Sequence, residues 1–223
     1  MSQIKQLLCD PEVFYLFSQS LGVKNVAFNH LVSFDPQFLA LPPNSKPLSI
    51  TLCSLIDSKN VDDTNKYDRD SSLLFIKQIT TDICGTVALL HSLMNSYPLL
   101  DLEAQSILHE IYSKFLDCPD PLEIGKFIDK NEKLLDNHNT HASALYETIG
   151  GSENHFVSYI YHNNSVYEMD GRKEAPYRII SDCPQEFFFE RTCEYLSSTL
   201  DACTQASAIY SYLNYDQTIN DLQ

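Results

Sequence analysis

The chain has 223 residues, of which 43% are hydrophobic and 20% are charged, so it can bury a substantial core and is neither disordered nor collagen-like. We expect one domain over residues 1–223. The formal net charge of −15 argues against binding to nucleic-acid backbones or anionic membranes, because both need clusters of Lys and Arg.

The chain shows no targeting or disulfide signal. Residues 1–6 lack the apolar core of a signal sequence, and no later run approaches the roughly 18 apolar residues of a membrane span. The seven cysteines are scattered and never spaced Cys-x-x-Cys, which indicates neither a disulfide framework nor a zinc site. We therefore expect a cytoplasmic monomer without metal or cofactor, whose acidity by itself indicates no more than solubility.

The N-terminal part predicts a helix, a short helix and a strand. Asp10 and Pro11 supply the cap and first turn of the first helix, and Gly22 ends it. Its predicted buried stripe is Val13, Leu16, Phe17 and Leu21. A short helix is predicted after Pro36, and a strand over residues 48–55. The polar run 57–70 has no periodicity and predicts an exposed loop.

The middle of the chain is richest in helix signals. The apolar run 72–77 is either a buried strand or the entry to the next helix. Residues 83–94 are apolar on nearly every face, which predicts a central helix. Two further helices are predicted over residues 101–116 and 121–135, and we expect both to cover one face of a sheet.

The C-terminal part combines a long loop with a last helix and strand. Residues 136–154 have weak periodicity and include two adjacent glycines, so they predict a loop, and loops of this length are often functional. A helix is predicted over residues 184–200 and a final strand over 206–213.

The strongest local signal for chemistry surrounds Cys84. Asp82 or Thr81 is predicted to cap the helix that follows, which places Cys84 in its first turn, where the macrodipole favours a thiolate. Gly85 is expected to leave room for a substrate backbone. A lone cysteine is more often a small buried hydrophobe, so Cys84 needs a partner before it can be assigned a catalytic role.

A hairpin offers that partner. Residues 155–162 predict a strand, Asn163-Asn164 a two-residue turn, and residues 165–170 the returning strand. This register makes His155 and Asp170 diagonal neighbours on one face, roughly 7 Å apart between backbones. A base and its orienting acid require this arrangement, although an ordinary hairpin with a surface histidine explains the pattern equally well.

Two more polar residues flank the nucleophile. Gln78 precedes the helix, and its amide together with the backbone N–H of Cys84 would form an oxyanion hole, typically worth about 3 kcal/mol. An exposed polar residue is the simpler alternative for Gln78. His91 lies two helical turns beyond Cys84, too far to act as its base, and is predicted to be a core histidine.

These motifs resemble the ubiquitin carboxyl-terminal hydrolase family. Gln78 followed by Asp82-Ile83-Cys84-Gly85-Thr86 is similar to the family's nucleophile motif, in which Asn-Ala precedes Cys-Gly-Thr. The family's histidine and acid motifs resemble His155-Phe156 and Glu168-Met169-Asp170-Gly171-Arg172-Lys173 in the same order. The resemblance begins at Asp10-Pro11-Glu12-Val13 and covers roughly residues 10–213. It implies a papain-like α/β fold with a central antiparallel sheet flanked by helices, a knotted backbone, and a crossover loop at 136–154.

The resemblance also implies a function. Cys84, His155, Asp170 and Gln78 would be nucleophile, base, orienting acid and oxyanion donor of an enzyme that cleaves small adducts or short peptides after the C-terminal glycine of ubiquitin. The acidic chain would then steer the basic face of ubiquitin toward itself. Asp82 replaces the family's Asn and opposes thiolate formation. Two alternatives therefore stay open: a catalytically weak ubiquitin-binding protein, and a hydrolase of another ubiquitin-like modifier.

Overall fold

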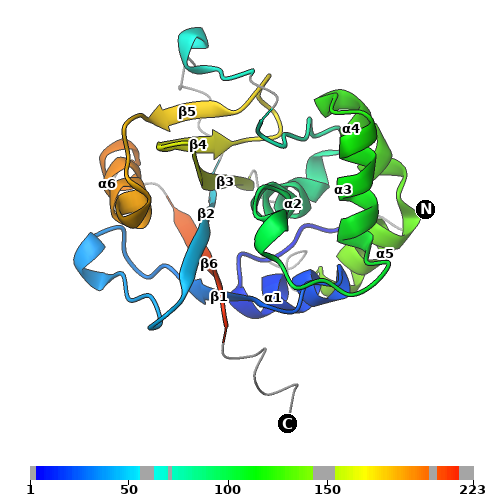
Figure 1. Ribbon diagram of the computed structural model, residues 1–223, viewed down its shortest axis with the longest axis horizontal. Helices are drawn as coiled ribbons and strands as arrows, with labels where there is room; N and C mark the ends of the chain where they lie inside the picture. The colour runs from blue at the N-terminus through cyan, green and yellow to red at the C-terminus, as the bar shows by residue number, and fades with distance from the viewer. Residues whose placement is uncertain (1–3, 56–62, 70–71, 143–153, 201–204, 216–223) are drawn as a thin grey trace.

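A six-stranded antiparallel sheet separates two layers of helices in the computed structural model of the protein (Figure 1). The structure describes residues 4–55, 63–69, 72–142, 154–200 and 205–215. The strand order is β1-β6-β2-β3-β4-β5. The strands are β1 (Val26–His30), β2 (Lys46–Leu55), β3 (Asn154–His162), β4 (Ser165–Met169), β5 (Tyr177–Ile180) and β6 (Ala206–Leu213). The predicted α/β architecture is confirmed.

The helices divide unequally between the two faces of the sheet (Figure 1). One face carries α1 (Pro11–Ser20), α2 (Cys84–Asn95), α3 (Ile107–Asp117), α4 (Pro121–Lys130) and α5 (Glu132–His141), and the other face carries α6 (Phe188–Thr199). Every residue of α2 from Cys84 to Met94 is buried. The central helix expected from its all-round apolar sequence is thus confirmed, and it packs against β3.

The first helix has the predicted ends but a different buried face. The Asp10 carboxylate accepts hydrogen bonds from the first-turn backbone N–H groups, and Gly22 follows the helix at a positive φ of 93°. Phe14 is fully buried, whereas Leu16 is 43% exposed, so the predicted stripe is wrong at Leu16. The buried face instead runs through Phe14, Phe17 and Ser18, and the Ser18 hydroxyl tolerates burial because it donates to the Tyr15 carbonyl.

The predicted helix over 101–116 begins later than expected. Its N-cap is Ser106, whose hydroxyl accepts the His109 N–H, and α3 starts at Ile107. The preceding residues are not helical, because Leu102 pairs with Val23, the Glu103 N–H donates to the Gly22 carbonyl, and residues 104–105 form a turn. Tertiary backbone pairing therefore overrides the helical periodicity of residues 101–106.

The segment predicted as one helix and a loop contains two helices. Asn131 interrupts the run over 121–135 by capping α5 with its side chain, which accepts the Leu134 N–H. The helix α5 then continues to His141, so the predicted loop over 136–154 is wrong for residues 136–141. Its buried contacts come from Leu134 and His138, four residues apart, and a single apolar contact per turn is a weak sequence signal. Residues 143–153 of that loop lie outside the described residues.

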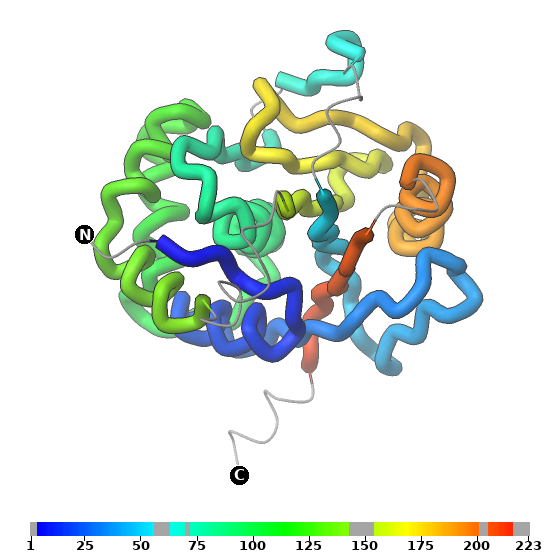
Figure 2. Tube along the Cα trace, turned by 180° about the vertical axis from the view of Figure 1, so that it is seen from behind, coloured from blue at the N-terminus to red at the C-terminus, as the bar shows by residue number. Residues whose placement is uncertain are grey.

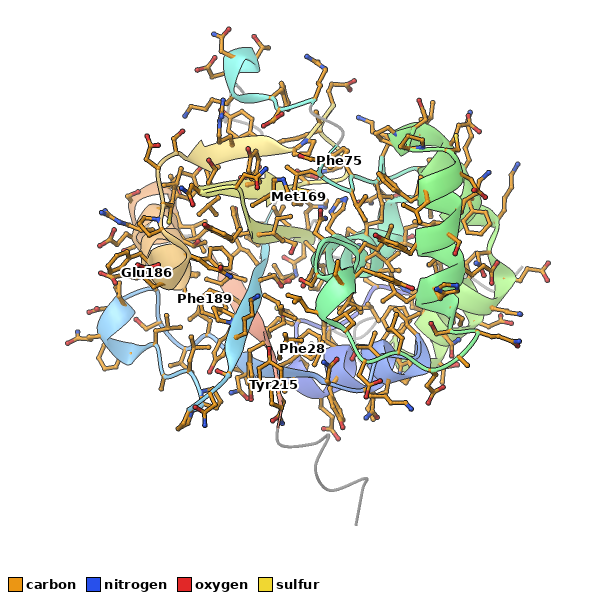
Figure 3. The ribbon with its side chains drawn as sticks, in the orientation of Figure 1. Phe28, Phe75, Met169, Glu186, Phe189 and Tyr215 are labelled. Carbon is orange, nitrogen blue, oxygen red and sulfur yellow. The ribbon has the colours of Figure 1, made fainter. Side chains whose placement is uncertain are left out.

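The run 72–77 is neither a strand of the sheet nor a helix. It is an extended buried segment whose Leu73 and Phe75 form a small apolar cluster with Met169 at the end of β4 (Figure 3). The last predicted elements are confirmed as α6 and β6, while β1 and β5 were not predicted. Both unpredicted strands are short, and their pairing partners are distant in sequence or displaced by a bulge.

Candidate active site

Cys84 is the first residue of the central helix. A 3-10 turn over Thr81–Ile83 leads into α2, and the Cys84 side chain is 2% exposed. Neither Asp82 nor Thr81 caps the helix, because the N-cap position is Ile83 and carries no side-chain hydrogen bond. The predicted cap is therefore wrong, while the predicted place of Cys84 in the first turn is confirmed. Asp82 instead accepts a 3.4 Å hydrogen bond from Gln6 Nε2.

The surroundings of the Cys84 thiol include groups that raise its pKa and groups that lower it. Burial raises the pKa of Cys84, and the nearby Asp82 carboxylate raises it further. Hydrogen bonds from the backbone of Phe156 and Gly85 and the positive charge of Arg172 lower it. The Phe156 bond fixes the thiol against β3, next to the residue predicted to be the base.

The predicted hairpin has the predicted register. Its turn residues Asn163 and Asn164 have positive φ angles of 45° and 56°, and His162 pairs with Ser165. Nε2 of His155 lies 2.7 Å from Oδ1 of Asp170. Both side chains are buried, with residue exposures of 5% and 4%. The predicted contact between an imidazole and a carboxylate is confirmed, and the alternative of a surface histidine is wrong.

Asp170 is held as a carboxylate. Burial by itself would raise the pKa of Asp170, but hydrogen bonds from His155 and Arg172 hold it well below its usual range. Because Asp170 occupies Nε2 of His155, Nδ1 is the ring nitrogen left for a thiol. Cys84 and His155 both lie in the described part of the chain, and no hydrogen bond joins the Cys84 thiol to the His155 ring there.

Gln78 lies between the start of the central helix and the loop after β4 that carries Asp170, the acid loop (residues 170–176). Its backbone N–H donates to the Gly171 carbonyl at 2.8 Å, and its Nε2 donates to the carbonyls of Thr80 and Thr81, both at 2.9 Å. Its Oε1 is buried and finds no hydrogen-bond partner within the described residues. Gln78 is half-buried rather than fully exposed, and its amide hydrogens point at local carbonyls rather than at Cys84.

An N-terminal segment, residues 4–9, packs against the start of the central helix (Figure 2). Leu7 is 1% exposed, and a Cβ added to Gly85 would lie 3.2 Å from the Leu7 Cβ. The ring of His138 on α5 hydrogen-bonds the Lys5 carbonyl. The space expected beside Gly85 is therefore filled by Leu7, which sequence reasoning missed because residues 4–9 carry no periodic pattern.

His91 is a buried structural histidine, as predicted. Its Nε2 accepts the Ile76 N–H at 3.0 Å, its Nδ1 donates to the Met169 carbonyl at 3.2 Å, and Phe75 stacks on its ring. Burial lowers the pKa of His91 to about 4, so the ring is neutral. His91 therefore ties the segment before Gln78 to the end of β4, where the acid loop begins.

Among the residues that the structure describes, no cluster of three or more His, Cys, Asp or Glu side chains could hold a metal ion. Within those residues, no helix is long and apolar enough to cross a membrane.

The fold and the site define a papain-like thiol hydrolase: a buried cysteine at the start of a central helix beside a His–Asp pair on an antiparallel sheet. The same fold occurs in the crystal structure of the UCH37 catalytic domain from Trichinella spiralis bound to ubiquitin vinyl methyl ester. The two structures match with a TM-score of 0.74 and 22% sequence identity, over 96% of this chain and 97% of that chain.

The chain belongs to the ubiquitin carboxyl-terminal hydrolases, family 1, whose family model matches residues 5–199. Ubiquitin carboxyl-terminal hydrolase YUH1 of Saccharomyces cerevisiae is 26% identical over 173 residues, which cover 73% of this chain and 72% of that protein. A ubiquitin carboxyl-terminal hydrolase of Aplysia californica is 28% identical over 183 residues, covering 75% of this chain and 81% of that protein. The family resemblance found in the motifs is confirmed.

Proposed function

We propose that this protein hydrolyses small adducts or short peptides from the C-terminal glycine of ubiquitin, with Cys84 as nucleophile. The observation that carries the proposal is the buried 2.7 Å contact between His155 and Asp170, on the strand whose next residue, Phe156, hydrogen-bonds the thiol. Family membership supports ubiquitin as the partner, and supports a free thiol rather than a metal as the source of the nucleophile.

The chemistry follows from the geometry of the pair. Asp170 holds Nε2 of His155, so Nδ1 takes the Cys84 proton when ring and thiol come within hydrogen-bond distance. The thiolate then attacks the carbonyl carbon of the terminal glycine, and the imidazolium returns its proton to the departing amine. Water assisted by His155 finally hydrolyses the thioester and restores the thiol.

Gln78 is the proposed oxyanion donor, together with the backbone N–H of Cys84. Its Nε2 now donates to two local carbonyls, while its Oε1 has no partner among the described residues. Turning the amide toward the substrate therefore breaks only those bonds and offers the freed N–H to the developing negative charge. A Gln78→Ala variant is expected to lose roughly 100-fold in kcat, with the fold intact.

The proposed partner and location agree with the charge and the cysteines. A formal net charge of −15 attracts the basic face of ubiquitin, and salt is expected to weaken that attraction. Cys84 has to be a free thiol to react, and the described cysteines are all free, which supports the reducing cytoplasm as the place of action. A ubiquitin-like modifier ending in Gly-Gly is the alternative substrate.

A second candidate function has specific support. Burial and Asp82 raise the pKa of Cys84, and the thiol makes no hydrogen bond to His155 within the described residues. These features would suit a protein that holds ubiquitin with little turnover. Tight binding of ubiquitin with negligible hydrolysis would favour this candidate over the hydrolase.

The test is hydrolysis of ubiquitin that carries a fluorescent amide at its C-terminus, at low and high salt. The wild type should release the fluorophore and slow with salt, while Cys84→Ala should not. Cys118→Ala is the matched control, because Cys118 is a half-buried free cysteine that ends α3, in a separate part of the helical layer. Hydrolysis by Cys84→Ala at the wild-type rate would overturn the proposal.

A further inference from the structure

Arg172 makes three hydrogen bonds to the Asp170 carboxylate, two residues before it. The backbone N–H donates to Oδ1 at 2.9 Å, Nε donates to Oδ1 at 3.3 Å, and Nη2 donates to Oδ2 at 3.0 Å. We infer that Arg172 is a positioning residue that sets the Asp170 carboxylate for His155 and acts on Cys84 through that pair. This inference rests on the proposed function.

The hydrogen bonds define the plane of the carboxylate. Nε and Nη2 of one guanidinium engage both oxygens of Asp170, and such a fork fixes orientation in a way that a single ammonium does not. Oδ1 also lies 2.7 Å from Nε2 of His155. The plane that Arg172 imposes is therefore the plane in which Asp170 meets the imidazole.

Arg172 is itself held in place. Lys77 Nζ donates to the carbonyls of Arg172 and Lys173, at 2.8 and 2.9 Å. The preceding Gly171 is packed so closely that an added Cβ would lie 2.8 Å from the Gln78 Cβ. The loop after β4 is thus fastened to the segment before the nucleophile, and this holds the Arg172 backbone next to Asp170, where the guanidinium reaches both carboxylate oxygens.

Arg172 also brings a permanent positive charge to the orienting acid. The titratable and charged groups that interact with Asp170 include His155 and Tyr159 on β3, His91 on α2, and Arg172. Of these four, only Arg172 is charged at every working pH. Its charge also acts on the Cys84 thiol and opposes the effects of burial and of Asp82. One side chain therefore links the orienting acid to the nucleophile.

Steady-state hydrolysis of the ubiquitin amide separates this role from substrate binding. Arg172→Gln is expected to lower kcat by roughly 10-fold to 100-fold, with KM within about 2-fold of the wild type, because positioning acts on the reacting groups. Arg172→Lys should recover part of kcat, since it restores the charge but not the fork. The matched control is Arg191→Gln, because Arg191 is exposed on α6 and pairs with Glu194 instead.

A second measurement needs no ubiquitin. The rate at which iodoacetamide alkylates Cys84, followed by peptide mass spectrometry, rises with pH as the thiolate forms. The midpoint of that rise should move to higher pH in Arg172→Gln and return toward the wild type in Arg172→Lys. Arg191→Gln should leave it unchanged. A merely structural role for Arg172 would not move this midpoint in a variant whose urea unfolding curve matches the wild type.

The outcomes decide between the two proposals. A rise in KM with unchanged kcat, or an unmoved alkylation midpoint in Arg172→Gln, would overturn the positioning role. If Arg172→Gln does not fold, Arg172→Lys decides, since its alkylation midpoint should stay near that of the wild type while its kcat falls below the wild-type value. Failure of the wild type to hydrolyse the ubiquitin amide would instead remove the proposed function, while the alkylation midpoints would still measure the effect of Arg172 on Cys84.

Discussion

His155 and Asp170 lie 15 positions apart in the sequence, yet Nε2 of one and Oδ1 of the other are 2.7 Å apart. The contact depends on a two-residue turn between β3 and β4, because the register of a hairpin decides which side chains share a face. The pair is buried, so the contact is shielded from water and from salt.

Replacement of Asp170 by Asn tests what the contact does for the reaction. The amide would keep the size of the side chain, but it would accept weakly and could donate to Nε2, favouring the wrong tautomer of His155. We expect kcat for the ubiquitin amide to fall on the order of 1000-fold, with ubiquitin binding retained. A loss of less than about 10-fold would contradict an orienting role for Asp170.

The turn offers a test of register. Asn163 and Asn164 both have positive φ, a conformation that Asn and Gly tolerate, so Asn164→Gly should keep full activity and leave the unfolding midpoint unchanged or slightly higher. Insertion of one Gly between them should abolish hydrolysis, since it moves Asp170 to the face opposite His155. Activity in the insertion variant would show that the pairing can slip without penalty.

Asp82 is expected to restrain the nucleophile. Its negative charge raises the pKa of Cys84, so Asp82→Asn should lower that pKa and increase the thiolate fraction at any pH below it. We expect alkylation of Cys84 by iodoacetamide at pH 7 to speed up by about 2-fold. Glu194→Gln serves as a charge-matched control, because Glu194 is exposed on α6 and pairs with Arg191, and equal acceleration in both variants would argue against a local effect of Asp82.

His91 makes stability depend on pH. Its pKa of about 4 in the folded protein lies below its ordinary value of 6.5, so between those values the unfolded chain binds a proton that the folded protein does not. The contribution of His91 is therefore complete above pH 6.5 and is lost as pH falls toward 4. Between pH 7 and 5 the wild type should lose about 2 kcal/mol more than His91→Gln in urea unfolding. Parallel losses would mean that His91 is not the group responsible.

Local sequence signals predicted the parts of the site that lie on regular elements. Cys84 follows from an apolar helix that begins beside it, and the His155–Asp170 pair follows from a period-2 pattern and a two-residue turn. These relations depend on residues close in sequence, so periodicity and turn chemistry determine them.

The remainder depends on contacts between distant segments. Leu7 covers Gly85, and Gln78 turns its amide toward local carbonyls, through packing that no periodic pattern encodes. The extension of α5 through residues 136–141 was missed because its buried contacts are too sparse to produce a helical pattern. Tertiary packing determines each of these features, so sequence reasoning on single elements could not predict them.

The proposed nucleophile and base belong to different layers of the molecule, since Cys84 starts α2 and His155 lies on β3 (Figure 1). The separation of the Cys84 thiol and the His155 ring is therefore set by how the helical layer packs on the sheet. A small translation of α2 along β3 changes this separation without disturbing either element. A change in packing between α2 and β3 far from the reacting atoms would therefore alter the separation of thiol and imidazole while leaving both side chains chemically unchanged.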